Sequence, residues 1–285
     1  MHMKSFFPAL IFLFICLSNL SAQQGQPLVP DLLGIQTYSY RNSMQKGIGP
    51  VLDTIKSLGL SIIEGEAAPK GMAPEAFKKM LDEKGISCVS IGTSYENLVK
   101  DPSNIAHEAK LVGATYVMVA WIPHDKDFNR EIAAKAIKDF NKAGKILKDS
   151  GITFCYHTHG YEFVPSGKAT LFDELVTKTN PDYVSFEMDI MWVYFGGQDP
   201  EKLLLKYPGR FSLMHVKDLK KGVKGNLTGG TNTENDVTVG TGQLNIPAII
   251  KAAKNSGVKY YFIEDESSRI STQIPATIEY LKSLN

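Results

Sequence analysis

The sequence predicts a single-domain α/β protein, a (β/α)8 TIM barrel in which eight parallel strands alternate with helices. Short apolar runs alternate with amphipathic segments along almost the whole chain, and this alternation occurs eight times. The 285-residue length fits one such barrel, which typically needs about 250 residues. A doubly wound open sheet is the alternative, but the first predicted strand is not followed by the Gly-x-Gly-x-x-Gly turn typical of that fold.

The predicted elements follow one another in a regular order. Strands are predicted at residues 33–37, 61–64, 86–91, 115–120, 152–157, 183–188, 211–216 and 259–264. Helices are predicted at residues 50–58, 74–83, 105–112, 129–148, 171–177, 200–206, 246–255 and 276–284. Gly85, Gly151 and Gly257 each stand just past a predicted helix and before a strand, where glycine commonly ends a helix.

Residues 1–22 have the layout of a secretory signal peptide. Lys4 supplies a positive charge, residues 6–17 form an apolar run, and mostly small or polar residues precede a predicted cleavage after Ala22. A lipoprotein signal would use Cys16, but Phe14 and Ile15 before it are too bulky for the usual pattern. The apolar run is too short for a membrane span, and no second run of spanning length follows. We therefore expect a secreted, periplasmic protein whose barrel covers residues 23–285.

Charge and cysteine content restrict the partners and the covalent chemistry. The predicted cleavage removes Lys4 and leaves 30 basic residues against 30 acidic ones, which argues against a nucleic-acid partner. Cys88 and Cys155 remain, each in a predicted core strand. Because these two strands are not expected to be neighbours, we predict buried free thiols rather than a disulfide.

Polar side chains gather at the predicted C-terminal ends of the strands, where (β/α)8 enzymes place their active sites. His157 and His159 project to the same side of an extended chain, and Glu162 follows them. Other strand ends add carboxylates and an imidazole, at Glu64, Glu66, Glu187, Asp189, His215 and Glu264. Such ligands favour one divalent transition metal, Mn, Co, Ni, Fe or Zn, over Ca. The alternatives are hydrogen-bonded histidines in a polar loop, a core histidine at His215 and a loop cap at Asp189.

Six side chains at these ends are predicted to bind a small carbohydrate substrate: Gln36, Tyr38, Arg41, Glu64, Trp121 and Trp192. Aromatic faces suit the C–H faces of a sugar ring, although aromatic residues also fill cores. Lys217 is open between a catalytic role and an ion pair with a carboxylate. Residues 220–242, rich in Gly, Asn and Thr, are predicted as a long loop that is either a lid or disordered.

Several motifs together carry a resemblance to a known family. They are GIQTYSYR at 34–41, YHTHGYEF at 156–163, EMDIMW at 187–192, GGQDP at 196–200, HVKD at 215–218, VGTG at 239–242 and IED at 263–265. The chain resembles the xylose-isomerase-like TIM-barrel superfamily of AP endonuclease family 2 type. This superfamily includes sugar isomerases and epimerases, inosose and dehydroshikimate dehydratases, and endonuclease IV. The resemblance covers nearly the whole mature chain, and it implies the barrel fold and a secreted bacterial member.

The resemblance also implies a set of metal ligands and catalytic candidates. In the ketose epimerases of this superfamily, a Glu, an Asp, a His and a second Glu hold the metal. These positions fall on His157, Asp189, His215 and Glu264, although the fifth-strand ligand is left open between His157 and His159. The two glutamates of those epimerases form the acid/base pair, so a histidine at position 157 argues against a simple two-carboxylate epimerisation. The remaining catalytic candidates are Glu264, His159, Glu162 and Lys217.

We therefore expect a metal-dependent isomerase or epimerase that abstracts the proton next to a carbonyl group of a sugar or keto-sugar. Secretion and the lack of a glycine-rich phosphate turn favour a non-phosphorylated substrate. The same enediolate chemistry on a 3-keto-glycoside would make the enzyme a lyase or hydratase. A non-catalytic sugar-binding barrel and an endonuclease IV-like hydrolase are further alternatives. Homo-oligomerisation is left open.

Overall fold

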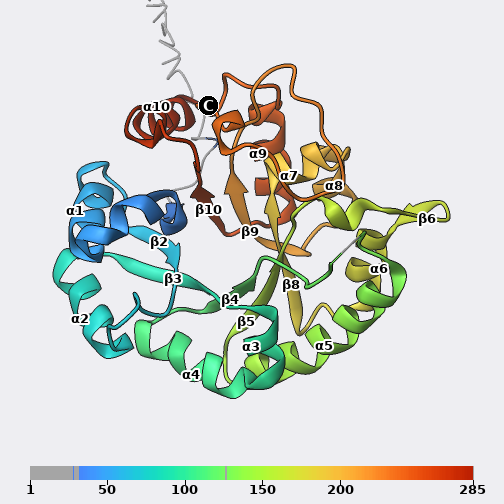
Figure 1. The fold of residues 1–285 in the computed structure, drawn as a ribbon, viewed down its shortest axis with the longest axis horizontal. Coiled ribbons are helices and arrows are strands. Elements are labelled where there is room, and N and C mark those ends of the chain that lie inside the picture. Colours follow the sequence, from blue (N-terminus) through green and yellow to red (C-terminus); the bar gives the residue numbers. More distant parts are fainter. Residues whose placement is uncertain (1–27, 29–31, 126, 285) are drawn as a thin grey trace, which may run out of the picture.

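The computed structural model describes residue 28, residues 32–125 and residues 127–284, which form a closed parallel barrel surrounded by helices (Figure 1). Its strands are β1 (Leu33–Gln36), β2 (Ile62–Gly65), β3 (Ser87–Gly92), β4 (Tyr116–Val119), β5 (Thr153–His157), β8 (Val184–Asp189), β9 (Phe211–Val216) and β10 (Tyr260–Ile263). They follow the chain order around the barrel, and β10 pairs with β1 to close it. The (β/α)8 fold predicted from the sequence is confirmed.

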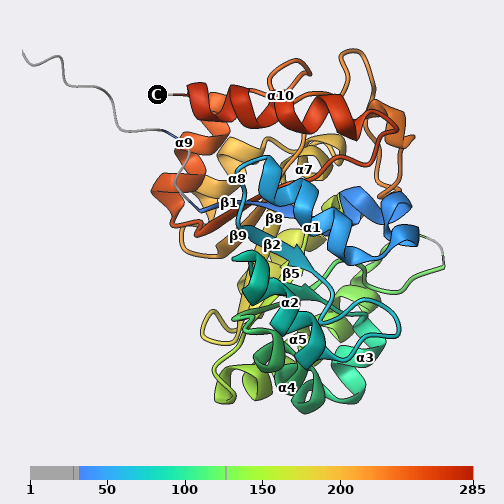
Figure 2. The ribbon, with the colours of Figure 1, turned by 90° about the vertical axis from the view of Figure 1, so that its left-hand side faces the viewer.

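The helices that cover the barrel are longer at several N-termini than the sequence patterns indicated. They are α1 (Ile48–Ser57), α2 (Pro74–Lys84), α3 (Tyr95–Lys100), α4 (Pro102–Val112), α5 (Arg130–Asp149), α6 (Leu171–Lys178), α7 (Ile190–Phe195), α8 (Pro200–Lys206), α9 (Ile246–Ser256) and α10 (Ile270–Ser283). The last helix was predicted at residues 276–284, but α10 begins six residues earlier, at Ile270. Pro275 lies inside α10. Figure 1 shows α10 between α9 and α1 on the outside of the barrel, and Figure 2 shows it running along the top of the molecule, above α1.

Short elements that the sequence analysis did not predict connect the main ones. They are the 3-10 helices η1 (Thr37–Lys46), η2 (Tyr161–Phe163) and η3 (Thr233–Asn235), helices α3 and α7, and the hairpin of β6 (Pro165–Ser166) and β7 (Ala169–Thr170). Helix α7 begins where strand β8 ends, and Asp189 caps it by accepting a hydrogen bond from the backbone N–H of Trp192. Because the last residue of β8 is also the N-cap of α7, no polar linker separates the strand from the helix. Hydrophobic periodicity alone therefore did not show where the strand ends and the helix begins.

Side chains alternate between the two faces of each strand and therefore build two cores. On strand β5, Phe154 and Tyr156 face outward, and their rings pack 5.0 and 5.2 Å from the ring of Phe140 on α5. Cys155, between them, belongs to a separate fully buried cluster with Leu213 and Phe262, on β9 and β10. This second cluster is an apolar layer inside the barrel, beneath the strand ends.

Cys88 and Cys155 are both buried and free, as predicted. Within the part of the chain that the structure describes, no helix is both long enough and apolar enough to cross a membrane. The predicted signal peptide, residues 1–22, lies outside the described residues.

Candidate active site

The candidate site lies two residues beyond the apolar layer on each contributing strand. Cys155 is followed on the same face by His157, Leu213 by His215 and Phe262 by Glu264. The strand register then aligns neighbours, because His157 pairs with Glu187 and Asp189 pairs with His215. Parallel strands thus bring residues from distant parts of the sequence into one buried polar layer.

Each of the two buried imidazoles has one ring nitrogen against a carboxylate. His157 Nδ1 lies 3.0 Å from Glu187 Oε2, and His215 Nε2 lies 2.6 Å from Glu64 Oε1. Glu64 also accepts a 2.8 Å hydrogen bond from Gln36 Nε2. These contacts fix the ring orientations, because a carboxylate holds the N–H of a neighbouring imidazole. In His157 this leaves Nε2 as an acceptor, whereas His215 also has its Nδ1 3.1 Å from Glu264 Oε2, and despite burial these carboxylates raise its pKa.

The opposite nitrogens of the two rings converge on Asp189. His157 Nε2 and His215 Nδ1 each lie 3.9 Å from Asp189 Oδ2, and His215 Nδ1 lies 3.1 Å from Glu264 Oε2. One ligand atom from each of His157, Asp189 and His215 lies within 4.8 Å of the others. The four ligands that the resemblance implied are therefore neighbours, and His157 rather than His159 stands in this group.

Three buried carboxylate oxygens in this layer have no hydrogen-bond partner among the described residues: Glu64 Oε2, Glu187 Oε1 and Asp189 Oδ2. Buried polar atoms are nearly always paired, so unpaired acceptors from fully buried residues indicate a missing positive partner. Two imidazoles and several carboxylates are also the donor set of divalent transition metals. The residues present fit a metal ion, which His157, Asp189 and His215 would hold, with Glu264 beside them.

Burial and neighbouring charges divide the carboxylates of this layer into two kinds. Burial raises the pKa of Asp189 to about 7, although the charges of Lys217 and His215 oppose the shift. Burial and the charge of Glu64 raise the pKa of Glu187. Burial also acts on Glu264, but there the positive charges of Lys217 and His215 prevail and hold its pKa well below the usual value. Lys217 and His215 thus favour the ionised form of Glu264, whereas burial favours the protonated forms of Asp189 and Glu187.

Lys217 lies behind Glu264 and is almost completely buried. Its Nζ donates to Glu266 Oε1 at 2.8 Å and to Glu264 Oε2 at 3.2 Å, and it lies 3.6 Å from Asp236 Oδ2. The structure therefore places this catalytic candidate in ion pairs with carboxylates, the alternative that the sequence left open. In this position it compensates the negative charge of the site.

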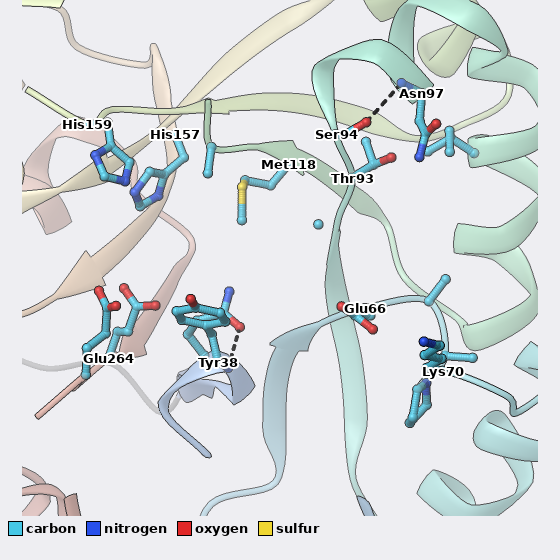
Figure 3. A pocket seen from close by; sticks show the side chains of 18 of the residues that line it. Tyr38, Glu66, Lys70, Thr93, Ser94, Asn97, Met118, His157, His159 and Glu264 are labelled. Carbon is cyan, nitrogen blue, oxygen red and sulfur yellow. Dashed lines mark hydrogen bonds between the residues drawn. The ribbon is translucent and has the colours of Figure 1, made fainter. Parts of the chain in front are cut away.

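A cavity of about 1040 Å³ opens above the histidine–carboxylate layer. Figure 3 shows His157, His159, Glu264 and Tyr38 at one end of it. Three of the predicted substrate-binding residues, Gln36, Tyr38 and Trp192, line the cavity.

The other three predicted substrate-binding residues lie elsewhere. Glu64 is fully buried beneath the cavity against His215, because its carboxylate points into the barrel. Trp121 is 40% exposed and stacks on His124, with ring centroids 4.7 Å apart, outside the cavity lining. Arg41 donates to the backbone oxygens of Tyr38 and Glu266 and so links the segment after β1 to the segment after β10.

His159 lines the cavity, but its Nδ1 is buried rather than open to it. Its ring stacks on Trp192, with centroids 4.6 Å apart, and its Nδ1 has no hydrogen-bond partner among the described residues. Burial, reinforced by the charge of Lys217, lowers the pKa of His159 to about 4. At neutral pH this side chain is an uncharged imidazole, as a general base requires.

Glu162, another catalytic candidate, does not line the cavity. Its carboxylate accepts hydrogen bonds from the Tyr156 hydroxyl and from the backbone N–H of His159 at 2.9 Å. Tyr156 in turn lies 2.8 Å from the Tyr161 hydroxyl, which accepts from the backbone N–H of Ile122 at 2.8 Å. Glu162 therefore supports the turn that carries His159.

Sequence reasoning missed several residues that the fold brings to the site. Asp236, from the loop between β9 and α9, reaches Lys217. Glu187 was named among the strand-end carboxylates, but its contact with His157 was not predicted. Thr93 and Asn97 line the cavity from the loop and helix that follow β3. Their only signal in the sequence was a position after a predicted strand, which many surface residues share.

Comparison with known proteins identifies the family to which this barrel belongs. The model of the xylose isomerase-like TIM barrel family matches residues 52–284. Inosose dehydratase from Geobacillus kaustophilus is 25% identical over 227 residues, 68% of this chain and 71% of that protein. Inosose dehydratase from Clostridium tetani is 31% identical over 96 residues, but the match spans only 34% of this chain and 32% of that protein.

Solved structures show the same architecture. A sugar phosphate isomerase/epimerase from Parabacteroides distasonis has a TM-score of 0.72 at 26% identity, over 88% of this chain and 93% of that one. The zinc-bound IOLI protein has a TM-score of 0.68 at 15% identity, over 88% and 95% of the two chains, which shows the shared fold. Because the family model covers most of the chain, the protein belongs to the xylose isomerase-like TIM barrel family.

Proposed function

We propose that the protein is a secreted, metal-dependent enzyme that abstracts the proton next to a carbonyl group of a non-phosphorylated sugar or keto-sugar. The observation that carries the proposal is the convergence of two carboxylate-backed imidazoles on Asp189, beside a cavity that His159 lines. The zinc-bound IOLI protein and the inosose dehydratases support a metal-assisted reaction on a sugar-like substrate. Residues 1–22 support export to the periplasm.

The residues of the site divide the chemical work. His157, Asp189, His215 and Glu264 would hold a divalent ion, which would supply positive charge to polarise a carbonyl oxygen and offset the negative charge that develops when the adjacent C–H bond breaks. Trp192 offers an apolar face to the sugar ring, and Gln36 and Tyr38 flank it. His159 accepts the proton on a ring nitrogen, and the electron pair of the C–H bond moves into the new C–C double bond. Glu264, charged and fixed by Lys217, orients a hydroxyl group.

The enediolate of the substrate has two outcomes. Return of a proton to a different carbon or face gives isomerisation or epimerisation. Expulsion of an oxygen substituent on the next carbon, which leaves with its bonding electron pair and takes up a proton, gives elimination. The relatives named inosose dehydratases favour elimination, so a lyase acting on keto-sugars is the preferred outcome.

The test measures the metal content of the purified mature protein and the incorporation of solvent deuterium into 3-keto sugars. We expect about one transition metal per chain and exchange at the carbon next to the carbonyl. Asp189→Ala should lose both metal and exchange. His159→Gln should keep the metal and lose exchange by about 100-fold or more. His107→Gln, on the exposed face of α4, is the matched control and should retain both.

Two results would contradict the proposal. Full metal occupancy in both Asp189→Ala and His215→Ala would remove the proposed centre. Sugar binding without exchange in any substrate, lost on changing His215, would instead indicate a non-catalytic binding barrel.

A further inference from the structure

The cavity extends well beyond the histidine–carboxylate layer. Its second end, here called the distal arm, is formed by Glu66, Lys70, Thr93, Ser94 and Asn97. Figure 3 shows these side chains opposite His157, His159 and Glu264, with Met118 between the two ends. The volume of about 1040 Å³ stands at the upper limit of the range of about 300–1,000 Å³ for pockets that bind small molecules. A single sugar ring at the histidines would leave the distal arm empty.

The distal arm carries polar groups that are free to bind a ligand. Among the described residues, no hydrogen bond or ion pair engages the side chains of Glu66, Lys70, Thr93 or Asn97. The backbone that presents them is fixed, however. Ser94 caps α3 by accepting from the N–H of Asn97 at 3.1 Å, and the N–H of Thr93 donates to Met118 O at 2.8 Å. Free donors and acceptors on a fixed backbone are suited to recognising hydroxyl groups.

The charges of the cavity disfavour an anionic substrate. Among the described residues that line it, Lys70 is the sole Lys or Arg, whereas Glu66 and Glu108 add negative charge at the same end. Binding of a phosphate group normally uses clustered cations or a helix N-terminus with free backbone N–H groups. Ser94 already occupies the N-terminus of α3, a helix of six residues. The distal arm thus matches an uncharged, hydroxyl-rich group.

The cavity also has apolar side chains, which a site for a sugar unit needs in addition to polar groups. Met118 lies between the two ends of the cavity, and Met72 and Ile105 line its distal part. Sugar rings present C–H groups on their faces and hydroxyl groups at their edges, so a binding site for them combines apolar contacts with several polar groups. The distal arm provides both.

We propose that the distal arm binds a second, uncharged sugar unit, so that the substrate is a glycoside of two sugar units rather than a monosaccharide or a sugar phosphate. This inference rests on the proposed function, because it assigns the reacting ring to the histidine end. It identifies Thr93 and Asn97 as residues that determine substrate size.

The test compares two uncharged substrates that differ by one unit, a 3-keto methyl glucoside and the 3-keto form of a glucose disaccharide. The metal-loaded wild-type protein should show a kcat/KM for deuterium exchange about tenfold higher for the disaccharide. Asn97→Ala and Thr93→Val should each lower this ratio about fivefold, mainly through KM, because each removes hydrogen bonds to an uncharged group. Glu96→Ala, on the same helix but outside the cavity lining, is the matched control and should keep the wild-type ratio.

Calorimetric binding of the corresponding unoxidised sugars separates this inference from the proposed function. Tighter binding of the disaccharide, weakened by Asn97→Ala, would support the distal arm even if no exchange occurred. Exchange at equal kcat/KM for both substrates, or a preference for a phosphorylated monosaccharide, would overturn the distal-arm assignment and leave the proton-transfer function standing. Neither binding nor exchange would overturn both.

Discussion

Glu162 is a fully buried carboxyl group with an unusual protonation equilibrium. Burial raises its pKa to about 7, although hydrogen bonds from Tyr156 and His159 oppose the shift. A raised carboxyl pKa means that the folded state holds the proton more tightly than the unfolded chain does. Between pH 4.5 and pH 7 the group therefore increasingly destabilises the fold as the pH rises.

Glu162→Gln should remove this pH dependence, because the amide keeps an acceptor oxygen but does not ionise. Relative to the wild type, the variant should gain about 3 kcal/mol of unfolding free energy between pH 4.5 and pH 8. Urea unfolding of both metal-free proteins at the two pH values measures the difference. A constant difference would show that Glu162 titrates normally in the folded protein.

Glu64 contacts His215 rather than the cavity, so in the proposed metal centre it would act through that imidazole and not on the substrate. Glu64→Ala should weaken metal binding about 10- to 100-fold, because the carboxylate behind a metal-binding imidazole fixes its orientation and its proton. Glu64→Gln, which keeps an acceptor oxygen, should lose less. Competition with a chelator measures the affinity, and Glu66→Gln, just beyond the end of the same strand, is the control. Unchanged affinity in Glu64→Ala would contradict this role.

At the scale of elements, the loop between β9 and α9 is fixed over the site. Asp236 accepts from the N–H of Glu266 at 2.9 Å, and Arg269 donates to the backbone oxygens of Glu234 and Asp236. Further along the loop, Gly229 adopts φ +67°, and a Cβ there would lie 2.8 Å from Tyr161 and 3.1 Å from Trp121. The loop therefore fits against the aromatic residues around His159.

Gly229→Ala should displace this part of the loop and destabilise the protein by about 1–3 kcal/mol, because it adds contacts to an unfavourable backbone conformation. Gly222→Ala separates the two effects, since Gly222 lies in the same loop at φ +83° and a Cβ there would meet no atom within 4 Å. Thermal unfolding and tryptophan fluorescence should change more in Gly229→Ala than in Gly222→Ala. Equal changes would show that the contact with the aromatic residues is unimportant.

The elements themselves were largely predictable, whereas the partners of the site residues were not. Each predicted strand overlaps an observed one, because apolar runs and glycine-capped helices are local patterns; Gly85 and Gly257, for example, have φ +61° and +90°. Glu64 is an example of a residue whose position was predictable but whose partner was not. Its position at a strand end was correctly recognised, but its contact with His215 spans 151 residues of sequence. The alternation of side chains along a strand predicts which face of the sheet a residue occupies. Which side chains of different strands come into contact depends on the register of the barrel, which the sequence does not show.

At the scale of the whole molecule, metal binding should stabilise the fold. An ion that binds the folded state at 100 times its Kd adds about 2.7 kcal/mol to the free energy of unfolding. For a chain of this size, that corresponds to a rise in Tm of roughly 5–10 °C. Calorimetry with and without a chelator should show the shift in the wild type and in His107→Gln, but not in Asp189→Ala. An unchanged wild-type Tm would contradict a metal centre within the native barrel.

The closed barrel should also protect its thiols. Burial raises the pKa of Cys88 to about 12 and raises that of Cys155 as well, so little reactive thiolate is present near pH 8. The native protein should resist thiol-labelling reagents, and both cysteines should react after denaturation. Rapid labelling of the native protein would indicate that the barrel opens readily.

The polar layer draws its groups from both ends of the chain. Gln36 and Glu64 come from β1 and β2, whereas His215 and Glu264 come from β9 and β10, and the pairing of β1 with β10 joins the two halves. During synthesis and refolding, the support that Gln36 and Glu64 give to His215 is therefore absent until the first strands meet the last. In the proposed metal centre, the gain of full metal affinity by a refolding chain would report on this final closure, because the carboxylate behind the imidazole is its last part to arrive.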